Sequence, residues 1–179
     1  GAGAAQTMMN LHHIKPGNRI LMLGSGNVGL VVSYQLMQSG CEVVALADAA
    51  PRVGGYGVHA AKIARCGVRF YLSHTIVRVE GDTHVTGVVI GQVGPDWKII
   101  PGTEKHFDVD TVCLAVGLSP MSQLLKQAEV QMDDTKGGHV PVCDKYGATS
   151  VPGISAAGDV SGIEEASSAM IEGRISGAA

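Results

Sequence analysis

The chain has 179 residues, of which 45% are hydrophobic and 16% charged, and its formal net charge at pH 7 is -3. This composition can bury a core, which argues against disorder, and no basic tract indicates a nucleic-acid partner. No apolar run approaches the ~20 residues that cross a bilayer, so we expect no membrane association. Residues 1–5 are not a signal peptide, and the four cysteines form neither a CxxC pair nor a metal cluster, which indicates a reduced, cytoplasmic protein.

A strand–turn–helix–strand pattern follows a short helix at the start of the sequence. A short helix is predicted over residues 4–13, and an apolar run over 19–23 then predicts a buried strand. Apolar spacing over 28–38 predicts a helix, and residues 42–47 a second strand. Strand, glycine-rich turn, helix and strand within about 30 residues make one βαβ unit, and hence two parallel strands.

The predicted alternation of strands and helices ends after residue 72. A helix over 58–66 and a strand over 68–72 still continue the alternation. The apolar stretches at 75–80, 85–90 and 97–100 then follow one another with only Gly, Asp and Pro turns between them. Strands without intervening helices predict an antiparallel meander.

The last third of the chain is predicted to hold four elements before its final helix: a buried strand over 110–117, a helix over 119–128, a short strand over 140–142 and a strand over 154–159. The final helix is predicted to open at Ser161 and to run to about Ile175, since Ser161 and Glu164 have the spacing of a capping box. We expect a domain boundary near residues 110–118.

The turn Gly24-Ser25-Gly26-Asn27-Val28-Gly29 follows a predicted strand and opens a predicted helix. That context is the one that a dinucleotide-binding GxGxxG turn requires. Gly24 would permit the tight turn, Gly26 would let a pyrophosphate approach the backbone, and Gly29 would let helix and strand pack closely. The N–H groups of this turn, those of Asn27 and Val28 included, and the helix dipole would favour the anion.

Asp48 ends the second predicted strand, where an acid would bind the adenosine ribose. Ala47 occupies the usual position, so Asp48 lies one residue further along, and it could instead begin the turn Ala49-Ala50-Pro51. NADP would need a basic residue here, and the sole candidate, Arg52, lies beyond the proline. The sequence therefore favours NAD(H) over NADP.

The second candidate site is Gly158-Asp159, at the end of a predicted strand and directly before the final helix. An acid in this position can accept hydrogen bonds from ligand hydroxyls, and a helix N-terminus can face the ligand. We assign no catalytic residue, because the sequence has no Tyr-x-x-x-Lys pair, no GxSxG elbow and no Walker lysine. A bound redox cofactor would explain this, since such a cofactor carries the reaction itself.

Taken in order, these motifs resemble the pyridine nucleotide-disulfide oxidoreductase superfamily, flavoproteins with one FAD and one NAD(P) domain. The turn at 24–29 is similar to the NAD(P)-binding turn of the superfamily, and 75–109 to the three-stranded excursion of its NAD(P) domain. Residues 110–120, which include Gly117, resemble the "ATG" crossover, and 149–160 the strand whose aspartate binds the ribityl chain of FAD. Within the superfamily, residues 1–6 and 162–166 are similar to the alpha subunits of sarcosine oxidase and hydrogen cyanide synthase.

The resemblance implies the roles of the carboxyl-terminal residues and the reaction. Gly158 and Asp159 would bind FAD, Glu165 and Ala166 would lie near its pyrimidine ring, and hydride would pass between nicotinamide and flavin. The implied fold is a Rossmann-like parallel sheet with an antiparallel meander, plus the carboxyl-terminal segment of a second, FAD-type lobe. Residues 1–17 would be a linker or helix from an upstream FAD lobe, 18–112 the NAD(P)-binding domain and 113–179 the second segment of the FAD-binding domain.

Two departures from the superfamily shape the expected partners. Nothing before Ile20 could form the turn that binds the ADP half of FAD, so the chain resembles the carboxyl part of a longer flavoprotein with an incomplete FAD site. An upstream FAD lobe of the same protein or of another subunit, in a homo- or hetero-oligomer, would complete it. Residues 7–13 lack the CxxC of thioredoxin reductases, and a dithiol of the glutathione-reductase type would lie in the missing part. The alternative is a non-catalytic nucleotide-binding or assembly module.

Overall fold

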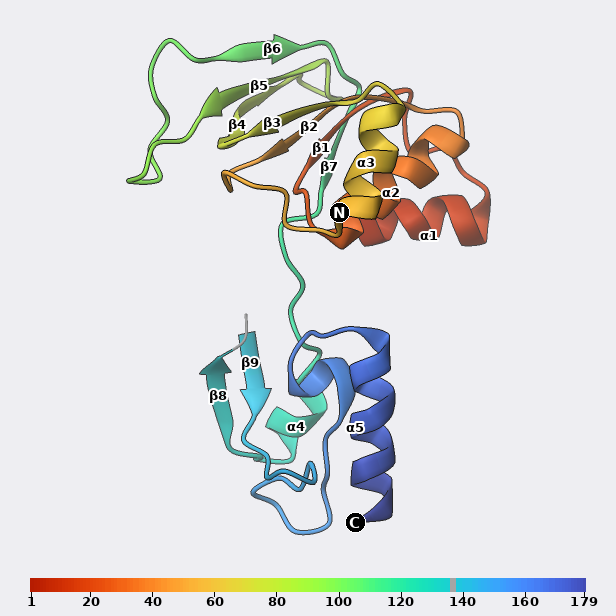
Figure 1. Cartoon of the computed structure of the whole chain (residues 1–179), viewed down its shortest axis with the longest axis vertical. Helices are drawn as coiled ribbons and strands as arrows, with labels where there is room; N and C mark the ends of the chain where they lie inside the picture. Colours follow the sequence, from red (N-terminus) through yellow and green to blue (C-terminus); the bar gives the residue numbers. More distant parts are fainter. Residues whose placement is uncertain (136–137) are drawn as a thin grey trace. The chain divides into compact units, whose positions relative to one another are not determined.

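The computed structural model describes residues 1–135 and 138–179, which form two compact units, Gly1–Val116 and Gly117–Ala179 (Figure 1). The units divide after Val116 rather than after residue 112. The reason is that β7 (Thr111–Leu114) completes the sheet of the first unit.

A parallel sheet forms the centre of the first unit. It consists of β1 (Arg19–Leu23), β2 (Glu42–Asp48), β3 (Arg69–Leu72) and β7, in the order β3-β2-β1-β7. All three neighbouring pairs are parallel. The βαβ prediction is therefore confirmed, and the α/β class with it. The strand order turns back at β1, which has the next strand, β2, on one side and the last strand of the sheet, β7, on the other.

Three helices cover one face of this sheet: α1 (Ala2–His12), α2 (Asn27–Gln38) and α3 (Gly57–Arg65) (Figure 1). Ile20 and Met22, alternate residues of β1, belong to the core on the helical side and are fully buried. Ala5 and Met9 of α1 are buried in the same core. The first helix thus packs within this unit, whereas the sequence assigned residues 1–17 to a linker or helix from an upstream FAD lobe.

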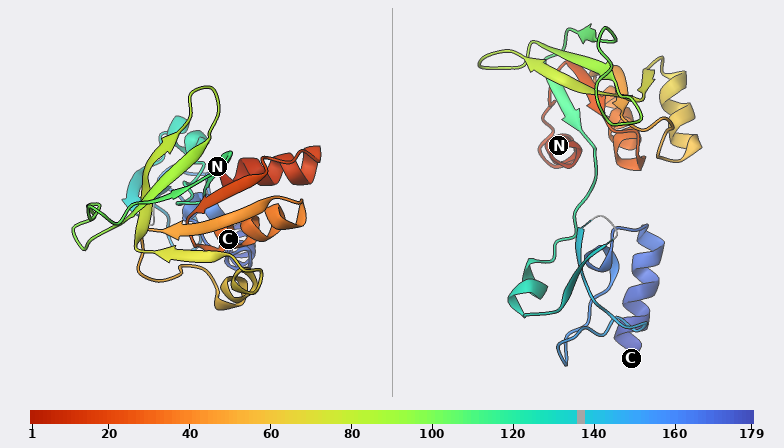
Figure 2. Two further views of the ribbon diagram at one scale, coloured as in Figure 1. Left: turned by 90° about the horizontal axis from the view of Figure 1, so that it is seen from above. Right: turned by 90° about the vertical axis from the view of Figure 1, so that its left-hand side faces the viewer.

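An antiparallel meander covers the opposite face (Figure 2). Its strands are β4 (His74–Glu80), β5 (Gly87–Gln92) and β6 (Lys105–Phe107). Leu21, the residue of β1 between the two that face the helices, packs here with residues of β5. Burial on both faces explains why the parallel strands are continuous apolar runs rather than alternating ones.

The third strand of the meander is not where the sequence predicted it. Residues 97–100 form no strand, and Ile99 makes an isolated bridge to Val93. The backbone N–H of Gly94 donates to the carbonyl of Lys98 at 2.8 Å, and Trp97 has a left-handed φ of 62°. The apolar stretch therefore lies at a tight turn, and the strand forms later, at Lys105–Phe107.

The second unit is built from shorter elements: α4 (Gln123–Gln127), the hairpin of β8 (Met132–Thr135) and β9 (Gly138–Pro141), the 3-10 helix η1 (Gly158–Ser161) and α5 (Ala166–Ala178). The helix predicted over 119–128 is thus confined to its second half, and no strand was predicted at β8. The short strand predicted at 140–142 overlaps β9.

Two further predictions for the second unit were wrong. The strand expected over 154–159 does not form: Ser155 makes an isolated bridge to Ala148, and Gly158-Asp159 lies in η1. An extended segment becomes a strand by pairing, and the described residues offer it no further partner. The capping box at Ser161 does not form either, because Gly162 has φ 141° and leaves the helical region. The helix begins at Ala166 instead.

Candidate functional site

The glycine-rich turn leaves the carboxyl end of β1, at the point where the strand order turns back. Parallel α/β sheets bind ligands in the crevice at such a switch point. The N–H of Gly24 donates to the carbonyl of Ala47 on β2 at 2.8 Å, and the N–H of Ala115 donates to the carbonyl of Leu23 at 2.7 Å. The turn is therefore tied to the strands on both sides of β1.

The three glycines of the turn differ in what surrounds them. Gly24 has φ 111°, and a Cβ there would collide with the carbonyl of Ala115. A Cβ at Gly29 would collide with the carbonyl of Gly24. A Cβ at Gly26 would meet no described atom within 4 Å. Gly24 and Gly29 are thus required by packing, whereas Gly26 leaves its backbone open to an approaching group, which fits a pyrophosphate.

The first turn of α2 adds donors to this opening. Gly26 is its N-cap, and Asn27 and Val28 are its first two residues. The first N–H groups of a helix have no acceptor within it and carry the positive end of its dipole. The first turn of α2, every residue of which is described, contains no acidic side chain that would oppose an anion.

Asp48, half-buried at the end of β2, lies against the turn. Its Oδ2 accepts hydrogen bonds from the N–H of Ser25 at 2.6 Å and from the Ser25 hydroxyl at 2.5 Å. Its Oδ1 accepts a hydrogen bond from the N–H of Ala50 at 2.8 Å. Asp48 therefore begins the turn after β2, as one interpretation of the sequence held, and its carboxylate lies beside the glycine-rich turn.

The segment that follows Asp48 packs on the same turn. The N–H of Gly55 donates to the carbonyl of Ser25 at 2.9 Å, and the N–H of Tyr56 donates to Oδ1 of Asn27 at 2.8 Å. A Cβ at Gly55 would approach the amide nitrogen of Asn27 to 2.9 Å, so this close packing requires glycine. Arg52, the candidate for recognising a 2′-phosphate, is exposed. Ser25 was not predicted as a site residue, because it occupies a position at which the GxGxxG motif accepts any residue.

The second unit holds the other predicted site residues. Gly158 has φ 77°, and its N–H donates to Oε2 of Glu172 on α5 at 2.7 Å. Asp159 is exposed, and its Oδ1 accepts a hydrogen bond from the N–H of Glu164 at 3.5 Å. Glu165 is the N-cap of α5 and Ala166 its first residue. These residues lie on one segment, 158–166. Gly117 is the first residue of the unit, and a Cβ there would meet no described atom within 4 Å.

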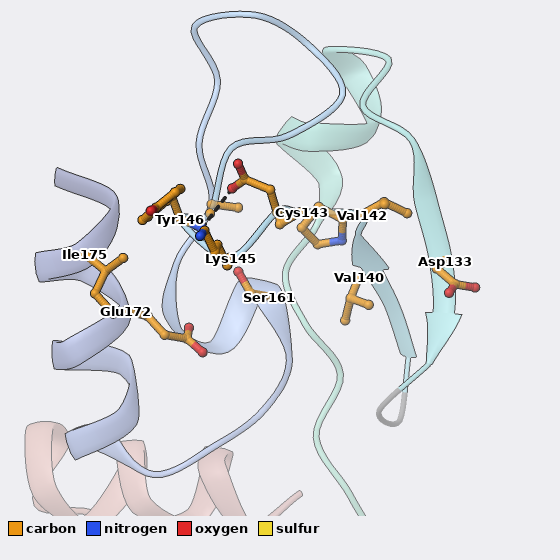
Figure 3. A pocket seen from close by; sticks show the side chains of 13 residues that line it. Asp133, Val140, Val142, Cys143, Lys145, Tyr146, Ser161, Glu172 and Ile175 are labelled. Atoms are coloured by element: carbon orange, nitrogen blue, oxygen red, sulfur yellow. Dashed lines mark hydrogen bonds between the residues drawn. The ribbon is translucent and has the colours of Figure 1, made fainter. Parts of the chain in front are cut away.

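A cavity of about 440 Å³ lies between β9 and α5 in the second unit (Figure 3). Val140 lines it from β9 and Glu172 from α5, with the Ser161 hydroxyl between them, buried and without a hydrogen-bond partner among the described residues. Burial, Asp144 and Glu172 raise the pKa of the Cys143 thiol in its wall, so this thiol stays protonated at neutral pH. Neither Gly158 nor Asp159 lines the cavity.

Two other kinds of site are absent from the described part of the chain. Residues 1–135 and 138–179 contain no group of three or more His, Cys, Asp or Glu side chains that could hold a metal ion. Within the same residues, no helix has both the length and the apolar character to cross a membrane.

An open glycine-rich turn at the switch point of a parallel sheet, with an acid at the end of the next strand, is typical of dinucleotide-binding Rossmann folds. The model of the pyridine nucleotide-disulphide oxidoreductase family matches residues 4–173. The chain belongs to this family of oxidoreductases, whose members use FAD and NAD(P)H. The resemblance described from the sequence is confirmed.

Individual relatives agree with this family assignment. The ferredoxin–NAD(+) reductase subunit of the benzene 1,2-dioxygenase system of Pseudomonas putida is 32% identical over 148 residues, which are 81% of this chain and 33% of that protein. Hydrogen cyanide synthase subunit HcnB of Pseudomonas aeruginosa is 24% identical over 97% of this chain and 41% of its own length. The thioredoxin reductase structure from T. acidophilum shares the fold, with a TM-score of 0.75 and 24% identity over 98% of this chain and 53% of that one. The chain spans less than half the length of the curated relatives it matches.

Proposed function

We propose that the chain is the NAD(H)-binding domain, with part of the FAD-binding domain, of an FAD-dependent pyridine nucleotide oxidoreductase. One observation carries the proposal: at the switch point of the sheet, the backbone at Gly26 is open while the Asp48 carboxylate is held beside it. An open backbone and an acceptor acid at this spacing suit the pyrophosphate and the adenosine ribose of one dinucleotide.

In this proposal the glycine-rich turn holds the pyrophosphate. Gly24 and Gly29 shape the turn, Gly26 gives access to its backbone, and the first N–H groups of α2, that of Val28 included, donate to the anion. Asp48 accepts from a ribose hydroxyl. A 2′-phosphate would bring negative charge against this carboxylate, and Arg52 is exposed, so we assign NAD(H) rather than NADP(H).

The second unit contributes to FAD binding in the proposal. Asp159 offers an exposed carboxylate to the hydroxyls of the ribityl chain, and Glu165 and Ala166 present the start of α5 to the flavin ring. Met170, Ile171 and Ile175 on α5 are 72%, 60% and 42% exposed. An apolar helix face of this kind needs a covering surface. We propose that an FAD-binding lobe, in the same protein or in another subunit, supplies both the cover and the rest of the site.

The two cofactors would supply hydride transfer, and the residues of this chain bind and orient them. No side chain here is assigned to proton transfer. The half-buried, protonated Cys143 is no candidate for a redox thiolate, because partial burial and two nearby carboxylates keep its pKa high.

Calorimetric titration of the 179-residue chain with NAD+ and NADP+ tests the proposal. We expect NAD+ to bind at least about tenfold more tightly than NADP+. Gly26→Ala should weaken NAD+ binding by about tenfold or more and leave the unfolding midpoint unchanged, because its Cβ enters open space over the backbone. Gly3→Ala is the matched control, since the Cβ of this residue on α1 also meets no described atom within 4 Å.

Absence of NAD+ binding at millimolar concentration would contradict the proposed nucleotide site. In that case, self-association on size-exclusion chromatography would favour the assembly-module alternative. Tight retention of FAD by the chain alone, measured by mass spectrometry, would contradict the proposal that its FAD site needs a further lobe.

A further inference from the structure

Ser25, the second residue of the glycine-rich turn, has no exposed surface, and none of the roles proposed above uses its side chain. Four hydrogen bonds converge on this residue. Its N–H and its hydroxyl both donate to Oδ2 of Asp48, at 2.6 and 2.5 Å. Its hydroxyl accepts from the N–H of Gly54 at 3.2 Å, and its carbonyl accepts from the N–H of Gly55 at 2.9 Å.

These hydrogen bonds join three separate segments: the turn after β1, the end of β2 and the loop that leads to α3. The hydroxyl links two of these segments, because it accepts a hydrogen bond from the N–H of Gly54 and donates one to Oδ2 of Asp48. Any effect of the Ser25 side chain on a bound nucleotide must therefore pass through Asp48 or through the Gly54–Gly55 backbone.

These hydrogen bonds also limit how the Asp48 carboxylate can bind a ligand. A carboxylate offers about four acceptor positions on its two oxygens. Two positions on Oδ2 are taken by Ser25, and one on Oδ1 is taken by the N–H of Ala50. One position on Oδ1 remains for a ribose hydroxyl, and its direction is set by the three donors that hold the carboxylate.

We propose that Ser25 is the positioning residue of the nucleotide site: it orients the Asp48 carboxylate toward the ribose and latches the Gly54–Gly55 segment onto the turn. This inference rests on the proposed NAD(H) site. Loss of the hydroxyl removes one of three donors from Asp48 and leaves the N–H of Gly54 without its acceptor. Gly54 is exposed, and without this hydrogen bond its segment is no longer tied to the turn, so the segment shifts, and Ala50, which also holds Asp48, shifts with it.

The test compares two nucleotides that differ only at the ribose. ADP and 2′,3′-dideoxy-ADP are titrated calorimetrically into the 179-residue chain and into Ser25→Ala. We expect the variant to bind ADP about tenfold more weakly and dideoxy-ADP equally well, because Ser25 acts through the ribose acceptor. Ser25→Cys, which puts a slightly larger group with a weaker donor at this position, should show the same selective loss.

Ser33→Ala is the matched control. Ser33 is likewise fully buried, on α2, and its hydroxyl has no hydrogen-bond partner among the described residues. We expect this variant to bind both nucleotides like the parent chain. In an Asp48→Ala background, moreover, Ser25→Ala should cause no additional loss of ADP affinity, since the residue it orients is gone.

Equal weakening for both nucleotides would mean a merely structural role and would overturn the proposal, as would unchanged ADP affinity. The latch has its own readout without nucleotide: the amides of Gly54 and Gly55 should exchange hydrogen about tenfold faster in Ser25→Ala. Unchanged exchange would overturn the latch. A parent chain that binds neither nucleotide would overturn the proposed function itself, and the positioning role with it.

Discussion

The two units of the chain bury their apolar surface to very different extents. In the first, every strand of the parallel sheet is paired, and Ile20, Leu21 and Met22 of its central strand have no exposed surface. In the second, none of the residues of α5, all of them described, is buried. The glycine-rich turn of the first unit therefore rests on a buried core. The expected FAD residues of the second unit, by contrast, lie beside a helix whose apolar side chains are uncovered.

One carboxylate from each unit illustrates a second difference. Asp110 in the first unit accepts hydrogen bonds from the N–H groups of Asn18 at 2.9 Å and Arg19 at 3.1 Å, and so joins the starts of β1 and β7. Asp144 in the second unit accepts from Tyr146 and Ala148, two and four residues further along. The hydrogen bonds of Asp110 therefore join two strands of the sheet, whereas those of Asp144 shape only its own loop.

The largest expected effect comes from the core of the first unit. Leu21→Ala should lower the free energy of unfolding of this unit by about 3 kcal/mol, because it removes a fully buried side chain from the core under the meander. Met170→Ala on α5, where the side chain is 72% exposed, should change stability by no more than about 0.5 kcal/mol. Urea denaturation followed by circular dichroism measures both, and similar losses would remove the contrast between the units.

Native-state hydrogen exchange should show the contrast directly. We expect the amides of α5 to open with a free energy about 2 kcal/mol lower than those of α2, since α2 buries Leu30, Val32 and Leu36 and α5 buries none of its described residues. NMR exchange rates on the unmodified chain supply the measurement. Equal protection of the two helices would mean that the second unit is as cooperative as the first.

The smallest expected effect is pH-dependent. Burial alone would raise the pKa of Asp110, but hydrogen bonds from the backbone of Asn18 and Arg19 outweigh it and hold that pKa below its usual value. The stabilisation is therefore complete above the unfolded pKa, about 3.9, and is lost as the pH falls through the lower folded pKa. Asp110→Asn should destabilise the first unit at pH 7 by about 1 kcal/mol or less, because solvent screens this exposed carboxylate.

Thermal unfolding of the parent chain and of Asp110→Asn between pH 7 and pH 3 checks this prediction. The difference between the two proteins should shrink toward the acid end. Asp144→Asn serves as the comparison, because it removes a carboxylate that holds only its own loop and should shift stability by no more than about 0.5 kcal/mol. A difference between parent and Asp110→Asn that is constant with pH would contradict the assignment.

The sequence predicted best what neighbouring residues determine. The strand at Arg19–Leu23, the glycine-rich turn and the helix after it follow from a short apolar run, glycines and helical spacing. Asp48 could be placed near the turn because parallel pairing of β1 and β2 brings the ends of both strands to one edge. No local pattern, by contrast, indicates Lys105–Phe107, whose strand depends on pairing with β5.

The predictions failed where the structure depends on pairing, on backbone conformation or on contacts that residue spacing does not show. The strand expected over 154–159 needs a neighbouring strand that the described residues do not supply. Ser161 has the sequence of an N-cap, yet Gly162 turns the chain before a helix can start. Ser25 fills a variable position of its motif, and its importance arises from Asp48 and Gly54, which no spacing rule connects to it.

The contact between Gly24 and Ala115 has a consequence for the order of folding during synthesis. Ala115 follows β7, the last strand of the sheet, so it leaves the ribosome long after the glycine-rich turn that it covers. The first βαβ segment can pair β1 with β2 as soon as both emerge, but the other side of β1 stays bare until the whole meander has been made. Long-range pairings of this kind close late because they carry the larger loop entropy. A nascent chain acquires a finished glycine-rich turn only once the entire first unit has been translated.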